Sequence, residues 1–324
     1  MTRLILTLLL AAVGCNRSSG SELATSQSAA KSGAVVRIGY QKSGAPFLLK
    51  SRSESLAARL QEQGATLEWL EFQAGPLLLE AMRAGSVDVG YVGETPPVFA
   101  QAGNVPFLYV AHEAPAPQAE AIIVPQRSPL QRLSDLRGKR VALNRGSNVH
   151  FLLLQALAKA GLTLDDLQVT FLPPADARAA FDSGNVDAWV IWDPFFAAAE
   201  LAGARVLQDG EGLVDNHQYY VARKEFAAAQ PKLLQIVLGA FDELGKWAGE
   251  HPEETAKLNA SASGISYDAL LRAEKRHTYG LLPITPDILQ RQQRIADAFV
   301  KVNAIPRAIE TKQAFVANNN WSAH

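Results

Sequence analysis

Cysteine is almost absent from this sequence, since Cys15 is the only one among 324 residues. A single thiol cannot form an intramolecular disulfide, so the fold must be stable without such cross-links. It also excludes zinc sites built from several cysteines. The six histidines, at positions 112, 150, 217, 251, 277 and 324, show no metal-ligand spacing. The sequence therefore predicts neither a metal site nor a cofactor.

Apolar runs long enough to cross a bilayer are missing as well. Residues 4–13 are apolar and follow Arg3, but the run is too short to span a membrane and has the layout of a secretory signal. We therefore expect residues 1–14 to be a signal peptide. Ala12-Val13-Gly14-Cys15 resembles the bacterial lipobox, in which the cysteine is lipidated, although Ala12 stands where leucine is usual. An ordinary signal peptide beside a chance cysteine is the alternative to a membrane-tethered periplasmic lipoprotein.

Charge of one sign is also lacking. The formal net charge is −1, and no block of basic residues occurs. Nucleic acids and anionic membrane surfaces are therefore poor candidates for partners. Residues 15–34 are rich in Ser, Ala and Gln and are typical of a flexible tether. About 290 residues remain, which is enough for two domains with sizeable cores.

Two successive sets of elements with the same order follow the tether. Each set reads strand, helix, strand, helix, strand. The first is predicted at residues 35–40, 45–62, 66–72, 75–84 and 87–92, and the second at 140–144, 147–160, 168–172, 175–183 and 186–192. Such alternation predicts an α/β fold with parallel sheets flanked by helices.

The two sets also resemble each other in sequence. Gly85-Ser86-Val87-Asp88 recurs 99 residues later as Gly184-Asn185-Val186-Asp187, where the aspartates are expected to cap a turn. Two copies of one unit predict two lobes with a cleft between them, lined by residues beyond the carboxyl ends of the strands. The polar turns at those ends are residues 41–43, 93–95, 145–148 and 192–193.

The connections between the lobes are expected near residues 112–119 and 210–218, next to apolar strands at 107–111, 119–124 and 218–222. The first lobe would then comprise residues 35–115 and 216–324, and the second residues 116–215. After residue 222 helices are predicted at 231–250, 252–262, 267–277 and 286–302, the last with Thr285 as N-cap. This helical tail is expected to pack on the first lobe.

Residues 140–161 have the features of an anion site. A short strand leads through a turn containing Gly146 into a helix that Ser147 is placed to cap. A helix N-terminus presents backbone N–H groups and the positive end of the helix dipole. An ordinary βα unit with a capped helix is the alternative. The segment lacks the lysine and the spacing of a phosphate loop.

Catalytic patterns are hard to find. No Gly-x-Ser-x-Gly elbow and no dinucleotide-binding Gly-x-Gly-x-x-Gly occurs. Glu94 and Asp193 could face each other across the cleft as an acid/base pair of a hydrolase or lyase. No nucleophile or metal accompanies them, so we do not expect an enzyme.

Six segments carry a family resemblance: IGYQK (38–42), EFQAGP (71–76), GETPPVFAQA (93–102), GSNVH (146–150), PADARAAF (174–181) and VDAWVIWDP (186–194). They resemble signature segments of the aliphatic sulfonate-binding proteins of ABC importers, over about residues 35–222. The resemblance implies a type II periplasmic-binding-protein fold, two lobes joined by a hinge, that closes on its ligand and delivers it to a permease and its ATPase for sulfur acquisition. The wider family also binds taurine, nitrate and pyrimidines. Residues 94–95 and 148–149 depart from the family pattern, so the preferred sulfonate is open.

A sulfonate is a permanent monoanion with three acceptor oxygens, and it needs hydrogen-bond donors more than a full counter-charge. The backbone N–H groups of Gly146–Asn148, the hydroxyls of Ser147 and Thr95 and the amides of Gln41 and Asn148 are predicted to supply them. Lys42 is either a contact or a solvated rim residue, and Trp192 is either a wall for the organic tail or a core residue. Gly93, Glu94, Asp193 and His217 complete the predicted ligand-binding set. We expect the protein to be a monomer.

Overall fold

The computed structural model describes residues 33–317. The predicted signal peptide, Cys15 and nearly all of the predicted tether lie outside the described residues. Within residues 33–317 the strands form two five-stranded sheets. No helix in this part of the chain has the length and apolar character needed to cross a membrane.

The first sheet has the strand order β2-β1-β3-β10-β4. Its members are β1 (Ala34–Tyr40), β2 (Ala65–Glu71), β3 (Val89–Gly93), β4 (Phe107–His112) and β10 (Gln218–Arg223). β1 pairs in parallel with β2 and β3, whereas β10 is antiparallel to both of its neighbours.

The second sheet repeats this arrangement in the order β7-β6-β8-β5-β9. Its members are β5 (Glu120–Val124), β6 (Arg140–Leu143), β7 (Gln168–Phe171), β8 (Ala188–Trp192) and β9 (Arg205–Asp209). Here β5 is the strand that runs antiparallel to both neighbours. In each sheet the antiparallel strand comes from the chain as it arrives from the other sheet. The parallel pairing predicted for the repeated strands is confirmed for β1, β2 and β3 and for β6, β7 and β8. The sequence analysis assigned no direction to β5 and β10, because an apolar run does not encode strand direction.

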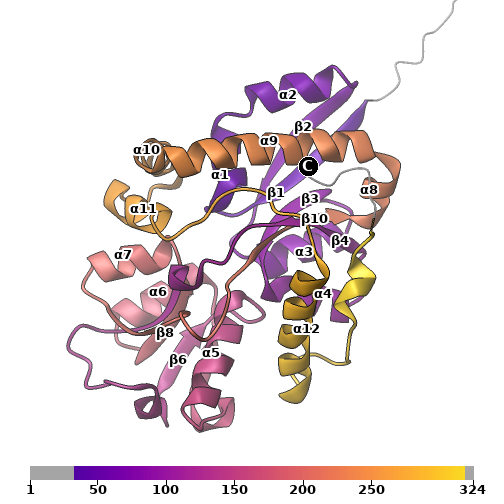
Figure 1. Ribbon diagram of the computed structural model, residues 1–324. Coiled ribbons are helices and arrows are strands. Elements are labelled where there is room, and N and C mark those ends of the chain that lie inside the picture. The colour runs from indigo at the N-terminus through magenta and orange to yellow at the C-terminus, as the bar shows by residue number, and fades with distance from the viewer. Residues whose placement is uncertain (1–32, 318–324) are drawn as a thin grey trace, which may run out of the picture. The chain divides into compact units, whose positions relative to one another are not determined.

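Helices connect the parallel strands of both sheets (Figure 1). Up to residue 201 the helices are α1 (Gly44–Ser51), α2 (Glu54–Gln61), α3 (Gly75–Arg83), α4 (Thr95–Ala102), α5 (Asn148–Lys159), α6 (Pro174–Asp182) and α7 (Phe195–Leu201). The single helix predicted at residues 45–62 is two helices in the structure. The sequence analysis did not predict α4, α7 or β9, since each is short and carries little periodic signal.

The predicted tail helices are present as α9 (Pro231–Glu250), α10 (Pro252–Ser263), α11 (Tyr267–Glu274) and α12 (Pro286–Lys301), after a short α8 (Lys224–Ala229). Thr285 caps α12 as predicted, because its hydroxyl accepts from the N–H of Ile288. α9 lies along α1 and α2 and packs Leu234 and Phe241 into the core of the first sheet (Figure 1).

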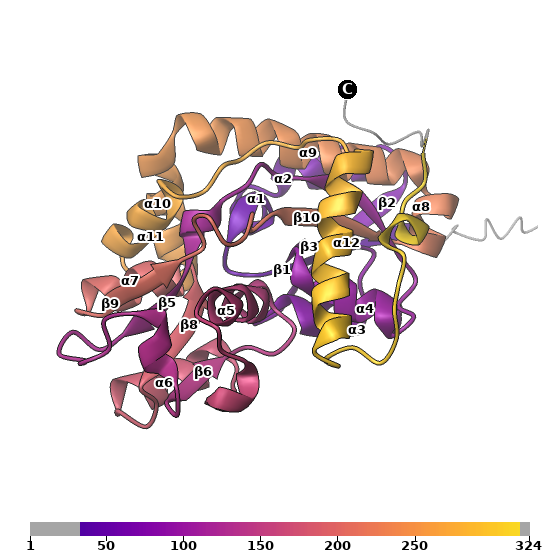
Figure 2. The same ribbon diagram turned by 60° about the horizontal axis from the view of Figure 1, so that its bottom comes forward.

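The tail is not confined to the first sheet, however. α12 lies beside α4 (Figure 2), and its Phe299 belongs to the same apolar core as Leu152 of α5. α11 packs on α7, where Ala269 and Ala273 contact Ala197. The tail therefore contacts the first sheet through α9, as expected, and also the second half of the molecule through α11 and α12.

Candidate functional site

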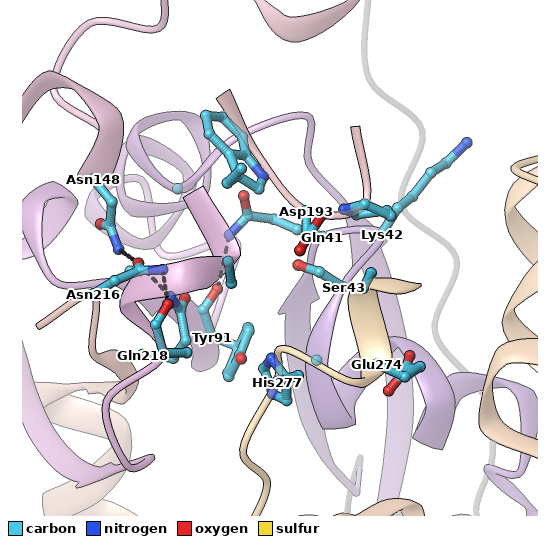
Figure 3. Close-up of a pocket in the computed structure, with 18 of the residues that line it drawn as sticks. Gln41, Lys42, Ser43, Tyr91, Asn148, Asp193, Asn216, Gln218, Glu274 and His277 are labelled. Carbon is cyan, nitrogen blue, oxygen red and sulfur yellow. Dashed lines mark hydrogen bonds between the residues drawn. The ribbon is translucent and has the colours of Figure 1, made fainter. Parts of the chain in front are cut away.

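A cavity of about 80 Å³ lies between the two sheets, at the carboxyl ends of their parallel strands. Four turns that the repeat analysis singled out contribute to it, together with both crossings and the tail. Figure 3 shows labelled side chains from the loop after β1, α5, the loop after β8, the second crossing and the tail around this cavity. We call this cavity the cleft.

Seven of the eleven predicted ligand-binding residues line the cleft, namely Gln41, Lys42, Gly93, Ser147, Asn148, Trp192 and Asp193. The other four, Glu94, Thr95, Gly146 and His217, do not line it. Thr95 is completely buried, and its backbone N–H donates to Asn148 Oδ1 at 3.1 Å. The matched strand ends thus converge as the repeat predicted, whereas the exact wall residues depend on side-chain direction.

The α5 N-terminus forms the second-sheet wall of the cleft. Ser147 occupies the N-cap position as predicted, with an extended backbone. Its hydroxyl does not cap the helix but donates to the carbonyl oxygen of Asn144 at 2.7 Å. Gly146 adopts φ +69°, and a Cβ there would lie 3.3 Å from the Phe99 ring, so glycine suits this turn. Backbone N–H groups of the first helical turn remain the main donors of this wall.

A chain of side-chain amides crosses the back of the cleft (Figure 3). Asn148 Nδ2 donates to Asn216 Oδ1 at 2.6 Å, and Gln218 Nε2 donates to the same oxygen at 3.2 Å. Asn216 in turn donates to the carbonyl oxygen of Ala116 at 2.8 Å. These bonds tie α5 to both crossings. Asn216 and Gln218 were not predicted as site residues, since nothing in their local sequence marks them.

The loop after β1 forms the opposite wall. Gln41 is buried and donates to the carbonyl oxygen of Tyr91 at 3.1 Å. Lys42 lies at the rim, where its side chain is 37% exposed and its ammonium is 3.8 Å from Glu71. Its position agrees better with a solvated rim residue than with a buried counter-charge.

The loop after β8 contributes Trp192 and Asp193. The Asp193 carboxylate accepts from the N–H of Ala197 at 2.9 Å and lies 3.4 Å from Arg276. Burial raises the pKa of Asp193 to about 7, although Arg276 opposes this shift. Trp192 also lines a neighbouring cavity of about 200 Å³, which Phe72, Pro174 and Phe195 share. Trp192 therefore lies where the cleft adjoins this second cavity.

The tail supplies a wall that the sequence analysis missed. Its cleft residues are Asn259, Leu270, Ala273, Glu274, His277 and Tyr279. The Tyr279 hydroxyl donates to Glu274 Oε2 at 2.6 Å. His277 Nε2 lies 3.1 Å from Oε2 of Glu113, which is buried on the first crossing. No motif in the tail pointed to these residues, because only the fold brings them to the strand ends.

Glu94 and His217 line a second cavity of about 570 Å³, beside α12 and the second crossing. The backbone N–H of His217 donates to Glu94 Oε2 at 2.9 Å. Burial raises the pKa of Glu94 to about 8, so this group is largely protonated at neutral pH. Glu94 and Asp193 therefore line different cavities, which removes the geometric basis for an acid/base pair across the cleft.

Comparison with known proteins agrees with this architecture. The model of the NMT1-like family matches residues 36–263. A protein of Escherichia coli (strain K12), named for binding aliphatic sulfonates, is 39% identical over 281 residues, which are 86% of this chain and 88% of that protein.

Two solved structures are similar at 37% identity. The alkanesulfonate-binding protein SsuA from Xanthomonas axonopodis pv. citri, bound to MOPS, has a TM-score of 0.83 and covers 87% of this chain and 98% of its own. The periplasmic aliphatic sulphonate binding protein SsuA from Escherichia coli has a TM-score of 0.80 and covers 90% and 94%.

The relatives confirm the two-lobed α/β fold and identify a binding protein rather than an enzyme. They match this chain over nearly their whole lengths, so the likeness is not limited to the strand-end motifs. The chain belongs to the NMT1-like family and, within it, to the aliphatic sulfonate-binding proteins.

Proposed function

We propose that this protein is the substrate-binding component of an ABC importer that captures aliphatic sulfonates for sulfur acquisition. The cleft carries this proposal, because its walls offer mainly uncharged donors from Gln41, Asn148, Gln218 and the α5 N-terminus. A permanent monoanion is well matched by such donors, since it requires no proton and no full counter-charge.

The anionic head is placed at the α5 N-terminus, next to Ser147 and Asn148. The organic tail is placed against Trp192, beside which the neighbouring cavity with Phe72 and Phe195 provides further space. Glu94, Thr95 and His217 take no direct part in this arrangement, because they do not line the cleft. They support it from behind through the bonds of Thr95 to Asn148 and of Glu94 to His217.

A thermal-shift panel tests the ligand class. Methanesulfonate, longer alkanesulfonates, taurine, nitrate, sulfate and a pyrimidine are added to the mature protein, and affinities of the stabilising compounds are measured by calorimetric titration. Alkanesulfonates are expected to raise the melting temperature most. Binding of nitrate or a pyrimidine without any sulfonate response would reject the proposal.

Delivery to the permease requires two lobes that move. We propose residues 35–115 with 216–324 as one lobe and residues 116–215 as the other, acting as a monomer that closes about the two crossings. Small-angle scattering should show a smaller radius of gyration with saturating sulfonate, and light scattering should give the mass of one chain. An identical scattering profile with and without ligand would exclude closure.

Membrane attachment through a lipid on Cys15 is part of the proposal, as supported by the lipobox-like segment before it. The full-length chain should fractionate with membranes, whereas Cys15→Ser should stay soluble or remain unprocessed. If both forms are equally soluble in the periplasm, the proposal of a lipid anchor is wrong, but the proposed transport function is unaffected.

A further inference from the structure

The imidazole of His277 lies beside the Glu113 carboxylate and lines the cleft. Nε2 lies 3.1 Å from Glu113 Oε2. Within the described residues Nε2 is buried and makes no well-aligned hydrogen bond, so its approach to Glu113 is an electrostatic contact, and His277 lines the cleft. Figure 3 draws His277 on the tail segment, at the edge of the cavity.

The Glu113 carboxylate beside His277 acts as a hydrogen-bond acceptor. Its Oε2 accepts from the Tyr91 hydroxyl at 2.7 Å, and its Oε1 accepts from the Tyr220 hydroxyl at 2.8 Å. Both carboxylate oxygens therefore act as acceptors, and a carboxylate 3.1 Å from the ring favours the imidazolium form of His277. Neutral imidazole has one N–H and one lone pair, whereas imidazolium has two N–H donors and a positive charge. Protonation of His277 therefore adds an N–H donor and a positive charge to this wall, and both favour binding of an anion.

We propose that His277, as an imidazolium held by Glu113, is the first-lobe donor to the sulfonate head, facing the α5 N-terminus across the cleft. This inference rests on the proposed function and names a residue that sets ligand affinity. The shared cavity supports it, because His277 lines the same cleft as Ser147 and Asn148 of the α5 N-terminus.

The charges around His277 favour the imidazolium. Glu113 faces it from the first crossing, Glu274 from α11 and Asp193 from the loop after β8, while Tyr279 lies beside its ring at 4.2 Å. Arg276 is the opposing cation, and it is bound to Asp193 and Glu200. Burial lowers the pKa of His277, but the three carboxylates outweigh burial and the net shift is upward.

The sulfonate itself does not titrate in the working range, so any pH dependence of binding reports a protein group. As pH rises through the pKa of His277, the N–H donor is lost. Methanesulfonate affinity of the wild type is therefore expected to fall tenfold to a hundredfold between pH 6 and 9, the range for a charge-assisted donor.

Calorimetric titration with methanesulfonate from pH 5.5 to 9 tests this assignment on four proteins. His277→Gln should bind weakly and show little dependence on pH, whereas His251→Gln, on a histidine stacked on Trp247 and absent from the cleft wall, should behave as wild type. Asp193→Asn is the fourth, because Asp193 titrates in the same window. If the pH dependence persists in His277→Gln and disappears in Asp193→Asn, the proposal is overturned in favour of Asp193.

Proton uptake by the wild type gives a second measurement that needs no variant. Titrations in buffers of different ionisation enthalpy should show up to one proton taken up per sulfonate near the pKa of His277. Sulfonate binding with no uptake and a constant affinity from pH 5.5 to 9 would reject the role of His277 and leave the sulfonate function standing. Absence of sulfonate binding at every pH would instead reject the function.

Discussion

The side-chain amide of Asn148 donates to Asn216 Oδ1 at 2.6 Å and thereby joins the first turn of α5 to the second crossing between the sheets. The same side chain accepts from the backbone N–H of Thr95 through Oδ1. Asn148 thus links the second half of the repeat to the first, directly behind the cleft.

This position of Asn148 requires glycine at residue 93. A Cβ on Gly93 would lie 2.1 Å from Asn148 Oδ1, well inside van der Waals contact. Gly93→Ala is therefore expected to displace Asn148, to cost about 1–3 kcal/mol of unfolding free energy through its lost bonds, and to weaken sulfonate binding at least about tenfold. Urea unfolding and calorimetric titration measure the two effects.

Gly239 in α9 provides the control, since no atom lies within 4 Å of a Cβ there. Gly239→Ala should leave binding unchanged and stabilise the helix by up to about 1 kcal/mol. Wild-type affinity in Gly93→Ala would show that the Asn148 link is dispensable.

Arg276 is expected to hold α11 against the second half of the molecule. Its guanidinium lies 3.4 Å from Asp193 and also pairs with Glu200, and its side chain is only 19% exposed. Arg276→Ala leaves two carboxylates without this partner in a buried position, so we expect a loss of about 3 kcal/mol in unfolding free energy.

Arg272 is the matched control, because it lies 3.8 Å from the same Glu200 with a 43% exposed side chain. Arg272→Ala should change stability by less than about 1 kcal/mol. Urea unfolding measures both variants. If both lose a similar unfolding free energy, the buried ion pairs of Arg276 contribute no more to stability than the exposed pair of Arg272.

Stability should fall with rising pH because of Glu94. Its folded-state pKa is raised to about 8, so between its ordinary value of 4.5 and 8 the unfolded chain binds fewer protons than the folded one. The contribution of this group falls by at most about 1.4 kcal/mol per pH unit in that window and is constant above it. Glu94→Gln keeps an acceptor for the His217 N–H and removes the titration.

Unfolding free energies at pH 5.5, 6.5, 7.5 and 8.5 test the slope. The difference between Glu94→Gln and wild type should grow in favour of the variant up to about pH 8. Glu250→Gln, at the exposed end of α9, should run parallel to wild type. A constant difference for Glu94→Gln across the series would contradict the raised pKa.

Trp192→Ala should act on the ligand tail. Long-chain and aryl sulfonates should lose about tenfold to a hundredfold in affinity, because they lose the indole wall, while methanesulfonate changes little. Ser147→Ala should instead affect short and long ligands alike, and weakly, since its hydroxyl is already donated to Asn144. Calorimetric titration of both variants with both chain lengths distinguishes the roles. Equal losses for all ligands in Trp192→Ala would place the tail elsewhere.

The sequence by itself determined the order of the elements and the place of the cleft. Apolar runs, the Gly-x-Val-Asp repeat and the N-terminal signals of α5, α9 and α12 mark their elements locally, because hydrophobic periodicity and capping act within a few residues. The ends of the repeated strands had to meet, so seven predicted residues, Gln41 and Asn148 among them, line the cleft.

Only the tertiary structure decided which side chains face the ligand and what the tail does. Glu94 and His217 are adjacent to cleft residues in sequence but project into a different cavity, a difference of side-chain direction that composition does not encode. His277 reaches the cleft from more than 50 residues beyond the last repeat-derived wall residue, and its charge depends on Glu113, a crossing residue that is distant in sequence. Such contacts form only when long-range packing brings separate segments together, and so a local sequence pattern does not predict them.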